Sequence, residues 1–143
     1  MSCIENNKRC GRRLKILLAK TGLDPHDRAI RLLAHTLKDR GKMDVFYSGL
    51  YRTIDEIVEL AVQQDVDVVG LGVHTGLQMT LFPELRDRLN RAGKSHVILI
   101  GGGVMPECDI ESLRSSGTVS EIFSYNRTYN DVLEWLNHVA VPV

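Results

Sequence analysis

The residues best suited to chemistry lie in one short segment, 20–29. Asp24 and His26 are two positions apart, and Pro25 between them disfavours a helix at this point. A neutral imidazole is a good ligand for a transition metal, and its second nitrogen commonly donates a hydrogen bond to a carboxylate. The Lys20 ammonium can pair with the same carboxylate. The spacing therefore suggests a Lys20–Asp24–His26 relay that presents one imidazole nitrogen to a metal ion.

The same segment also has a simpler interpretation. Asp27 is a good N-cap for a following helix, and Asp24 is a common turn residue. His26 is then a solvated loop residue that binds nothing. Because Asp-x-His pairs are frequent by chance, the spacing alone favours this second interpretation.

The rest of the chain, which must position this segment, alternates short apolar runs with amphipathic stretches. Three of the runs are rich in Val, Ile and Leu, which is typical of strands buried on both faces of a parallel sheet. Thr53 followed by Glu56 predicts a capping box, and Gly41, Gly93 and Gly117 are predicted helix C-caps. We expect strands at 14–19, 43–47, 67–71, 96–100 and 121–123, and helices at 28–40, 54–64, 80–92, 108–115 and 129–138.

Strict alternation of strand and helix predicts right-handed crossovers and a sheet with helices on both faces. Five such units in about 130 residues is the size of a flavodoxin-like (Rossmann-like) α/β domain with a five-stranded parallel sheet. Ligands of these folds bind beyond the carboxyl ends of the strands, near the switch in strand order. We therefore expect one domain over residues 14–143, preceded by a flexible tail, 1–13, with its chemistry just after residues 19, 71, 100 and 123.

Composition excludes several classes of function. The 143 residues carry 18 Lys+Arg against 18 Asp+Glu, and this neutrality argues against direct binding of nucleic acid. No apolar run approaches the roughly 18 residues of a membrane span, and no apolar signal segment begins the chain. Cys3, Cys10 and Cys108 form no CxxC pair, so we expect reduced thiols in a cytoplasmic protein. A metal site on Cys3 and Cys10 would have too few ligands.

Segment 20–29 resembles the cobalamin-binding motif Asp-x-His-x-x-Gly, in the longer form Lys-x-Gly-x-Asp-Gly-His-Asp-Arg-Gly that is typical of acyl-CoA mutases. Further matches follow in the same order at 47–53, 65–70, 79–83 and 101–106, so that the resemblance covers about residues 14 to 123. The chain is similar to the cobalamin-binding domain family. Within it, the chain resembles the small cobalamin-binding subunit of methylmalonyl-CoA and 2-hydroxyisobutyryl-CoA mutases.

The resemblance implies that His26 displaces the cofactor's own dimethylbenzimidazole and becomes the lower axial ligand of cobalt. Asp24 would hold the distal imidazole nitrogen, Lys20 would support Asp24, and the displaced nucleotide tail would enter a cleft beside the strands. Glycines at strand ends would let the backbone approach the cofactor closely, although tight turns also explain them. The implied cofactor-binding residues are Lys20, Gly22, Asp24, His26, Asp27, Arg28, Gly70, Thr75, Gly76, Gly102 and Gly103, with His26 as the metal ligand.

Departures from the family pattern cluster around the nucleotide tail. Pro25 and Ala29 each replace a glycine of the motif. Gly72 stands where mutases usually have a serine that can hydrogen-bond the dimethylbenzimidazole, and His74 replaces a leucine. His74 is most simply a polar residue at the cleft mouth, rather than a ligand or a proton relay. The family's Gly-Pro-Gly-Thr loop is replaced by 124–127, which brings a bulky Tyr and Arg to a place where the tail needs room. We therefore expect cobalt ligation to be retained more readily than the usual tail pocket.

The resemblance implies the cofactor-binding subunit of an isomerase, an adenosylcobalamin-dependent acyl-CoA carbon-skeleton mutase. In such enzymes the cofactor carries the radical chemistry. This chain would be inactive without a large barrel subunit that binds the substrate and covers the upper corrin face. A second hypothesis is a stand-alone cobalamin-binding sensor of light or cofactor state, or a carrier, acting through partner contacts or self-association. A third is a flavodoxin-like domain that has lost cobalamin.

Overall fold

A parallel sheet of five strands forms the centre of the molecule in the computed structural model, which describes residues 13–124 and 127–139. The strand order is β2-β1-β3-β4-β5. Adjacent central strands are in register, with Leu18 opposite Gly70 and Gly70 opposite Ile100. The strands are β1 (Lys15–Ala19), β2 (Asp44–Tyr47), β3 (Val68–Gly72), β4 (Ile98–Gly102) and β5 (Glu121–Phe123). The helices are α1 (Arg28–Asp39), α2 (Ile54–Gln64), α3 (Gln78–Arg91), α4 (Glu107–Ser115) and α5 (Tyr129–Val139).

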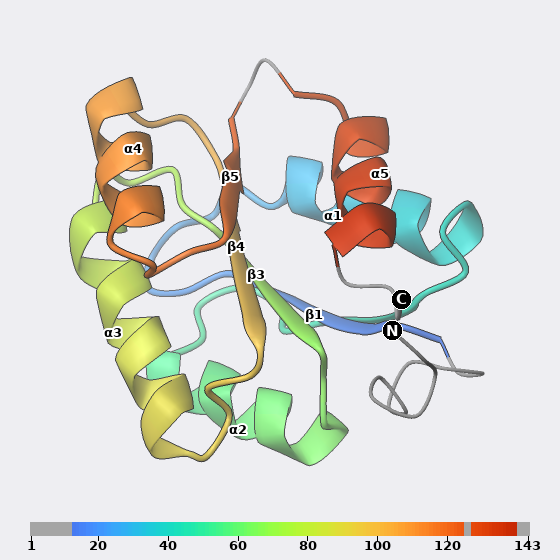
Figure 1. The fold of residues 1–143 in the computed structure, drawn as a ribbon, viewed down its shortest axis with the longest axis horizontal. Coiled ribbons are helices and arrows are strands. Elements are labelled where there is room, and N and C mark those ends of the chain that lie inside the picture. Colours follow the sequence, from blue (N-terminus) through green and yellow to red (C-terminus); the bar gives the residue numbers. More distant parts are fainter. Residues whose placement is uncertain (1–12, 125–126, 140–143) are drawn as a thin grey trace.

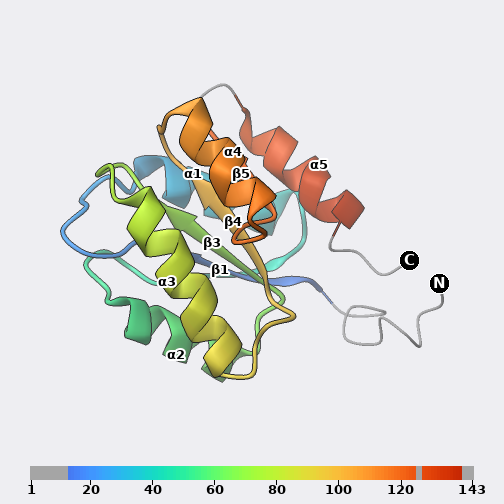
Figure 2. The same cartoon turned by 60° about the vertical axis from the view of Figure 1, so that its left-hand side comes forward.

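Helices cover both faces of the sheet, as the alternation of elements predicts. One layer contains α2, α3 and α4, and the other contains α1 and α5 (Figure 1). Figure 2 brings α3 and α4 in front of the strands. Successive side chains of β1 alternate between the two layers, since Leu17 packs in the core under α2–α4 and Leu18 packs in the core under α1 and α5. This confirms the predicted fold class.

All ten expected elements are present, with shifts at some ends. β4 begins at Ile98 and ends at Gly102, two residues later at each end than expected. Its first ladder bond runs from the Ile98 amide to the Asp67 carbonyl, and its last two residues are glycines. Glycine has low strand propensity, so composition could not show that Gly101 and Gly102 continue the ladder opposite Leu71 and Gly72. α3 begins two residues earlier than expected, at Gln78.

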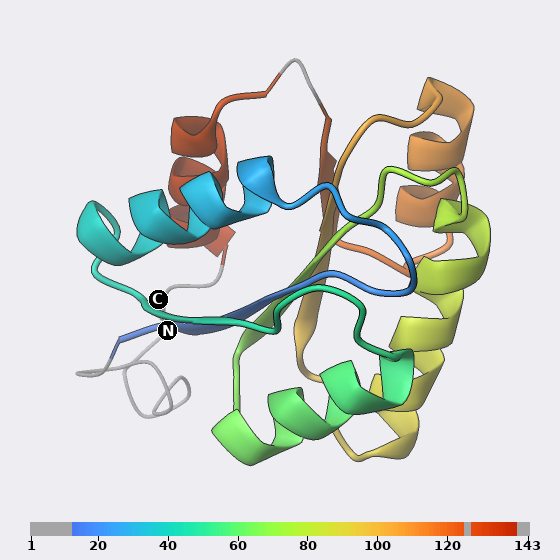
Figure 3. The same ribbon diagram turned by 180° about the vertical axis from the view of Figure 1, so that it is seen from behind.

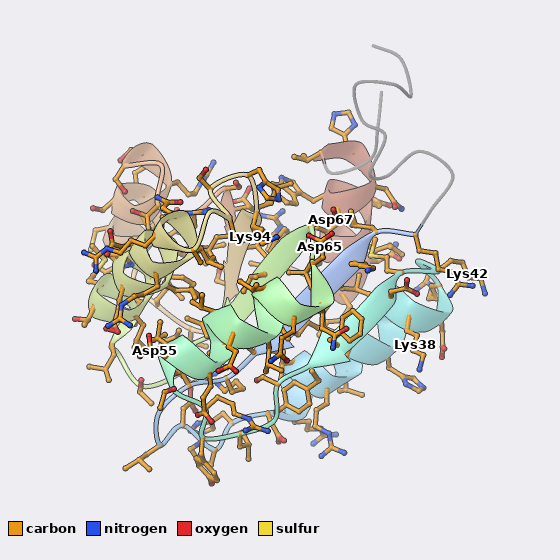
Figure 4. The ribbon with its side chains drawn as sticks, turned by 90° about the horizontal axis from the view of Figure 1, so that it is seen from below. Lys38, Lys42, Asp55, Asp65, Asp67 and Lys94 are labelled. Carbon is orange, nitrogen blue, oxygen red and sulfur yellow. The ribbon has the colours of Figure 1, made fainter. Side chains whose placement is uncertain are left out.

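The predicted capping box of α2 is confirmed. The Glu56 amide donates to Thr53 Oγ1 at 3.0 Å, and the Thr53 amide donates to Glu56 Oε1 at 2.9 Å. Figure 4 shows Asp55 in the first turn of this helix and Asp65 at its opposite end. Asp65 has a left-handed backbone (φ 49°), and its Oδ1 accepts a hydrogen bond from Lys94 Nζ at 3.1 Å. Both ends of α2 are therefore held by side chains.

The prediction of three glycine C-caps holds at two positions. Gly93 and Gly117 each follow a helix with φ of +78°, a conformation that favours glycine. Gly41 was expected to do the same and does not: α1 ends at Asp39 with Arg40 as its C-cap, and the left-handed residue is Lys42. A Cβ at Gly41 would lie 2.6 Å from the Leu37 carbonyl oxygen of α1 and 2.6 Å from a methyl group of Leu133 in α5, so lack of space on both sides accounts for this glycine.

Some expectations concern residues outside the described ranges. Residues 1–12 of the predicted tail, which include Cys3 and Cys10, lie outside the described ranges. Tyr125 and Asn126 lie outside them as well. Cys108 is a free, exposed thiol. In residues 13–124 and 127–139, none of the helices has the length and apolar character to cross a membrane.

The strand order places the switch point between β1 and β3. The chain leaves β1 towards β2 on one side, while β3 lies on the other side. In flavodoxin-like folds, ligands bind at the carboxyl end of this strand pair. The loop after β1, shown in blue in Figure 3, leads from that edge back into α1. It contains Lys20, Asp24 and His26, and the loop after β3 contains His74.

Candidate cofactor-binding site

Lys20 is the buried centre of a polar network at the switch point. It directly follows β1, its side chain is fully buried, and its amide donates to Ser48 Oγ at 3.2 Å. Its ammonium nitrogen lies 2.6 Å from Asp24 Oδ2, 3.0 Å from the Gly72 carbonyl oxygen and 3.3 Å from His74 Nδ1. An ammonium group has three hydrogens to donate, so these three acceptors use all of them.

The Asp24 carboxylate joins the ammonium to His26. Asp24 Oδ1 accepts from the His26 amide at 3.1 Å and from His26 Nδ1 at 2.8 Å, while Oδ2 accepts from Lys20 and from the His74 amide at 3.0 Å. Burial raises the pKa of the Asp24 carboxyl, but the hydrogen bonds from Lys20, His26 and His74 outweigh burial and hold that pKa well below its usual range. The carboxylate is therefore charged at neutral pH.

His26 exposes one ring nitrogen. Its side chain is 63% exposed, and Nδ1 donates to Asp24, so the neutral ring carries its hydrogen on Nδ1 and its lone pair on Nε2. A carboxylate partner of this kind fixes the tautomer of a metal-binding histidine and makes its free nitrogen more basic. The structure thus brings Lys20, Asp24 and His26 together in the order that their spacing suggested.

The simpler interpretation of Asp27 as a side-chain N-cap is wrong. Asp27 is the residue before α1, but its carboxylate makes no capping hydrogen bond. Instead, Asp27 Oδ2 accepts from the Tyr47 hydroxyl at 3.4 Å and lies 3.8 Å from the Arg31 guanidinium. Burial raises the pKa of the Tyr47 hydroxyl, and the Asp27 charge raises it further. Asp27 therefore ties the start of α1 to β2, and Arg28 beside it is exposed.

A largely apolar cleft of about 570 Å³ opens beside the polar network, between the sheet and the helices α1 and α5. Among the residues implied by the resemblance, Gly70, Gly102 and Gly103 line it, and so does Ala29. A Cβ at Gly70 would lie 2.9 Å from a methyl group of Leu18, so bare backbone is required in this wall. The other lining residues are Leu18, Ile30, Leu33, Leu71, Gly72, His74, Ile100, Gly101, Val104, Phe123, Ser124, Arg127, Thr128, Tyr129 and Val132.

Gly70, Gly102 and Gly103 are the implied residues that line the cleft, and the other eight, His26 among them, do not. Three of those eight are Gly22, Thr75 and Gly76. All three are exposed in the loops after β1 and β3. Gly22 and Gly76 have φ values of +66° and +83°, and such turns favour glycine whether or not a ligand is near. The turn conformation is thus sufficient to explain these two glycines.

The apolar wall of the cleft was not found by sequence reasoning. Ile30 and Leu33 come from α1, Val132 comes from α5, and Phe123 ends β5. Each belongs to an apolar helix face or strand, and that pattern is the same for a core position as for a cleft wall. Arg127 lines the cleft, and its guanidinium lies 4.6 Å from the centre of the Phe123 ring. The expectation that its bulk reduces the room for the nucleotide tail stays a prediction.

His74 lies where the polar network meets the cleft, as its interpretation as a polar residue at the cleft mouth requires. Its side chain is 25% exposed, and its ring centre is 5.3 Å from that of His26. Burial lowers the pKa of His74, and the Lys20 ammonium and His26 lower it further against the opposing effect of Asp24. His74 is therefore a neutral imidazole at neutral pH.

These features suit a large cofactor with one open metal position. His26 offers a single nitrogen lone pair, and within residues 13–124 and 127–139 no group of three or more His, Cys, Asp or Glu side chains could hold a metal ion. The cleft has the volume of a typical cofactor pocket. The glycine backbone along β3 and β4 leaves room for close approach. The residues present therefore fit a large cofactor to which His26 would add one nitrogen ligand.

Fold and site together define a flavodoxin-like domain with a cofactor-binding cleft at its switch point. The model of the B12 binding domain family matches residues 14–133. The chain belongs to this family, and its cofactor is cobalamin.

Two relatives show where such a domain occurs as a separate chain. The 2-hydroxyisobutanoyl-CoA mutase small subunit of Aquincola tertiaricarbonis is 47% identical over 104 residues, covering 73% of this chain and 76% of that protein. The pivalyl-CoA mutase small subunit of Xanthobacter autotrophicus is 36% identical over 123 residues, covering 86% and 81%. A cobalamin-binding protein of Desulfitobacterium hafniense shares the fold, with a TM-score of 0.74 at 22% identity over 88% of this chain and 58% of that one.

Proposed function

We propose that this chain is the small subunit of an adenosylcobalamin-dependent acyl-CoA carbon-skeleton mutase, and that His26 is the lower ligand of cobalt with the cofactor's own base displaced. The observation that carries the proposal is the hydrogen bond from His26 Nδ1 to the buried Asp24 carboxylate at 2.8 Å. That bond leaves the Nε2 lone pair available on an exposed ring. The family and the mutase relatives support the choice of cofactor and enzyme class.

The work of this chain is binding and orientation. Lys20 and Asp24 keep the His26 ring in one tautomer and one orientation, since both partners are buried and cannot exchange with water. The apolar cleft beside them is the place for the displaced nucleotide tail, with Gly70 and Gly103 allowing close approach. When bound, adenosylcobalamin supplies the radical chemistry of the rearrangement.

A second chain is expected over the same edge of the sheet. Large apolar side chains are exposed in or beside the loops after β1, β2, β3 and β4, where a monomer would normally carry polar residues. The five side chains are Leu23, Tyr51, Leu77, Met79 and Val104. They lie in or beside the loops at the same edge of the sheet as His26, so a large substrate-binding subunit that covers the cofactor would bury them. The small-subunit relatives favour this partner over self-association.

The test is an absorption titration of the purified chain with adenosylcobalamin. The wild type should give the spectrum of cobalamin with its own base displaced and a histidine bound, and His26→Ala should lose that spectrum. His35→Ala is the matched control, because His35 is an exposed histidine of α1 that pairs only with Asp39. Binding with an unchanged spectrum in His26→Ala would refute the ligand assignment, and no binding by the wild type would refute the proposed function.

Activity separates the mutase subunit from a sensor. Added to a mutase large subunit, the wild-type chain should restore isomerisation of an acyl-CoA, and the chain with His26→Ala should not. A bound corrinoid whose illumination changes the oligomeric state, without any activity in the reconstituted pair, would instead identify the stand-alone sensor.

A further inference from the structure

His74 lines the cleft, and one of its two ring nitrogens faces the buried Lys20. Its Nδ1 lies 3.3 Å from Lys20 Nζ, and its amide is fixed by a hydrogen bond to Asp24 Oδ2 at 3.0 Å. Lysine donates hydrogen bonds and cannot accept them, so His74 Nδ1 must be the acceptor. The 3.9 Å separation between His74 Nδ1 and Asp24 Oδ2 is too long for a competing hydrogen bond.

This contact fixes the tautomer of the ring. A neutral imidazole that accepts at Nδ1 carries its hydrogen on Nε2. Lys20 cannot release the ring easily, because its side chain is fully buried and its other two hydrogens are held by Asp24 and the Gly72 carbonyl. His74 Nε2 has no hydrogen-bond partner within residues 13–124 and 127–139, and the ring lines the cleft among mostly apolar side chains.

A fixed Nε2–H group cannot bind a metal, since both ring nitrogens are already used. It can donate to an acceptor that enters the cleft. The displaced heterocycle of a cobalamin tail has an in-plane nitrogen lone pair, which is such an acceptor. Gly72 stands where the family resemblance leads one to expect a serine, and a Cβ there would lie 3.3 Å from Lys20 Cδ and crowd the buried lysine. The hydroxyl at position 72 is absent, and a donor is present two residues later.

We propose that His74 is a specificity-determining residue that donates from Nε2 to the displaced base of the cofactor's nucleotide tail. The inference rests on the proposed cobalamin binding. It extends that proposal to the preference of this chain for corrinoids with the nucleotide tail over corrinoids without it. The His74 ring lies 5.3 Å from the His26 ring, but the hydrogen bond that holds His26 goes to the other oxygen of Asp24. The contribution of His74 should therefore depend on the presence of the tail.

The test compares the dissociation constants of adenosylcobalamin and of adenosylcobinamide, which lacks the nucleotide. Loss of one hydrogen bond in His74→Leu should weaken adenosylcobalamin binding about three- to tenfold and leave adenosylcobinamide binding unchanged. His74→Gln should retain most of the preference, because its amide can accept from Lys20 and donate to the base. Thermal unfolding of the three proteins without cofactor checks that each is folded.

The outcomes separate this inference from the proposed function. If the wild type binds neither corrinoid, the proposed function fails and the inference fails with it. If the wild type binds both and His74→Leu weakens them by the same factor, or weakens neither, cobalamin binding stands and the role of His74 is refuted. If the His74→Gln protein loses the preference as fully as His74→Leu, hydrogen-bond donation is refuted.

Discussion

The buried pair of Lys20 and Asp24 should dominate the stability of the site, and a double-mutant cycle can measure it. The perturbations are Asp24→Asn, Lys20→Met and both together. In the wild type the two side chains are 0% and 4% exposed and their charged atoms are 2.6 Å apart. Asp24→Asn replaces the buried negative charge by a neutral amide and leaves the Lys20 ammonium without a counter-charge.

Removing one partner of a buried ion pair typically costs about 3–5 kcal/mol, while replacing both partners by uncharged groups is often close to neutral. We therefore expect each single variant to lose about 3 kcal/mol or more of unfolding free energy, and the double variant to lose clearly less than the sum. The matched control is Asp27→Asn in the same loop. Its carboxylate is half-buried and makes only a 3.4 Å hydrogen bond and a 3.8 Å ion pair, so a loss under about 1 kcal/mol is expected.

Urea unfolding followed by tryptophan fluorescence is the assay. The single tryptophan, Trp135, packs edge-on against Phe123 at 5.7 Å and reports on the core under α5 rather than on the mutated loop. Additive losses in the double variant, or single losses no larger than that of Asp27→Asn, would refute the reasoning.

The stabilisation that Asp24 provides should also depend on pH, in a direction that follows from its lowered pKa. The pKa of Asp24 in the folded protein lies below its value of about 3.9 in an unfolded chain. The unfolded state therefore binds more protons in acid, and the stabilisation by Asp24 is complete above about pH 4 and is lost as the pH falls through the folded pKa. The difference between wild type and Asp24→Asn should be constant from pH 8 to pH 5 and should shrink below about pH 4.

Two further predictions concern stability, measured by urea or thermal unfolding. Thr53→Ala should cost about 1 kcal/mol, because it removes the acceptor of the Glu56 amide in the capping box, and an unchanged midpoint would contradict that role. Gly103→Ala should cost at least about 2 kcal/mol, since φ is +125° and the new Cβ would clash with the Val73 carbonyl oxygen. Gly102→Ala is its control, because the nearest atom to a Cβ there is 3.7 Å away; equal losses in the two variants would contradict the clash.

Local patterns were sufficient for the order and type of every element. Buried strands and amphipathic helices have distinct periods, and the capping box at Thr53 depends only on a residue three positions away. The predictions from sequence were wrong where tertiary packing determines the role of a residue. Gly41 looks like a C-cap because it ends a helix pattern, but its lack of a side chain avoids the Leu37 carbonyl oxygen and a methyl group of Leu133 from a distant helix.

The sequence by itself determined the alternation of strands and helices, the family motif, and the two-residue spacing that lets Asp24 hold His26. These are properties of neighbouring residues. Only the tertiary structure decided that Lys20 meets the Gly72 carbonyl and His74, more than 50 positions away, because β1 pairs with β3 at the switch point. The same pairing decided the tautomer of His74, and the packing of α1 and α5 on the sheet left the cleft open beside it. Which groups of distant loops can form hydrogen bonds depends on which strands are adjacent in the sheet. No local sequence pattern specifies that strand order.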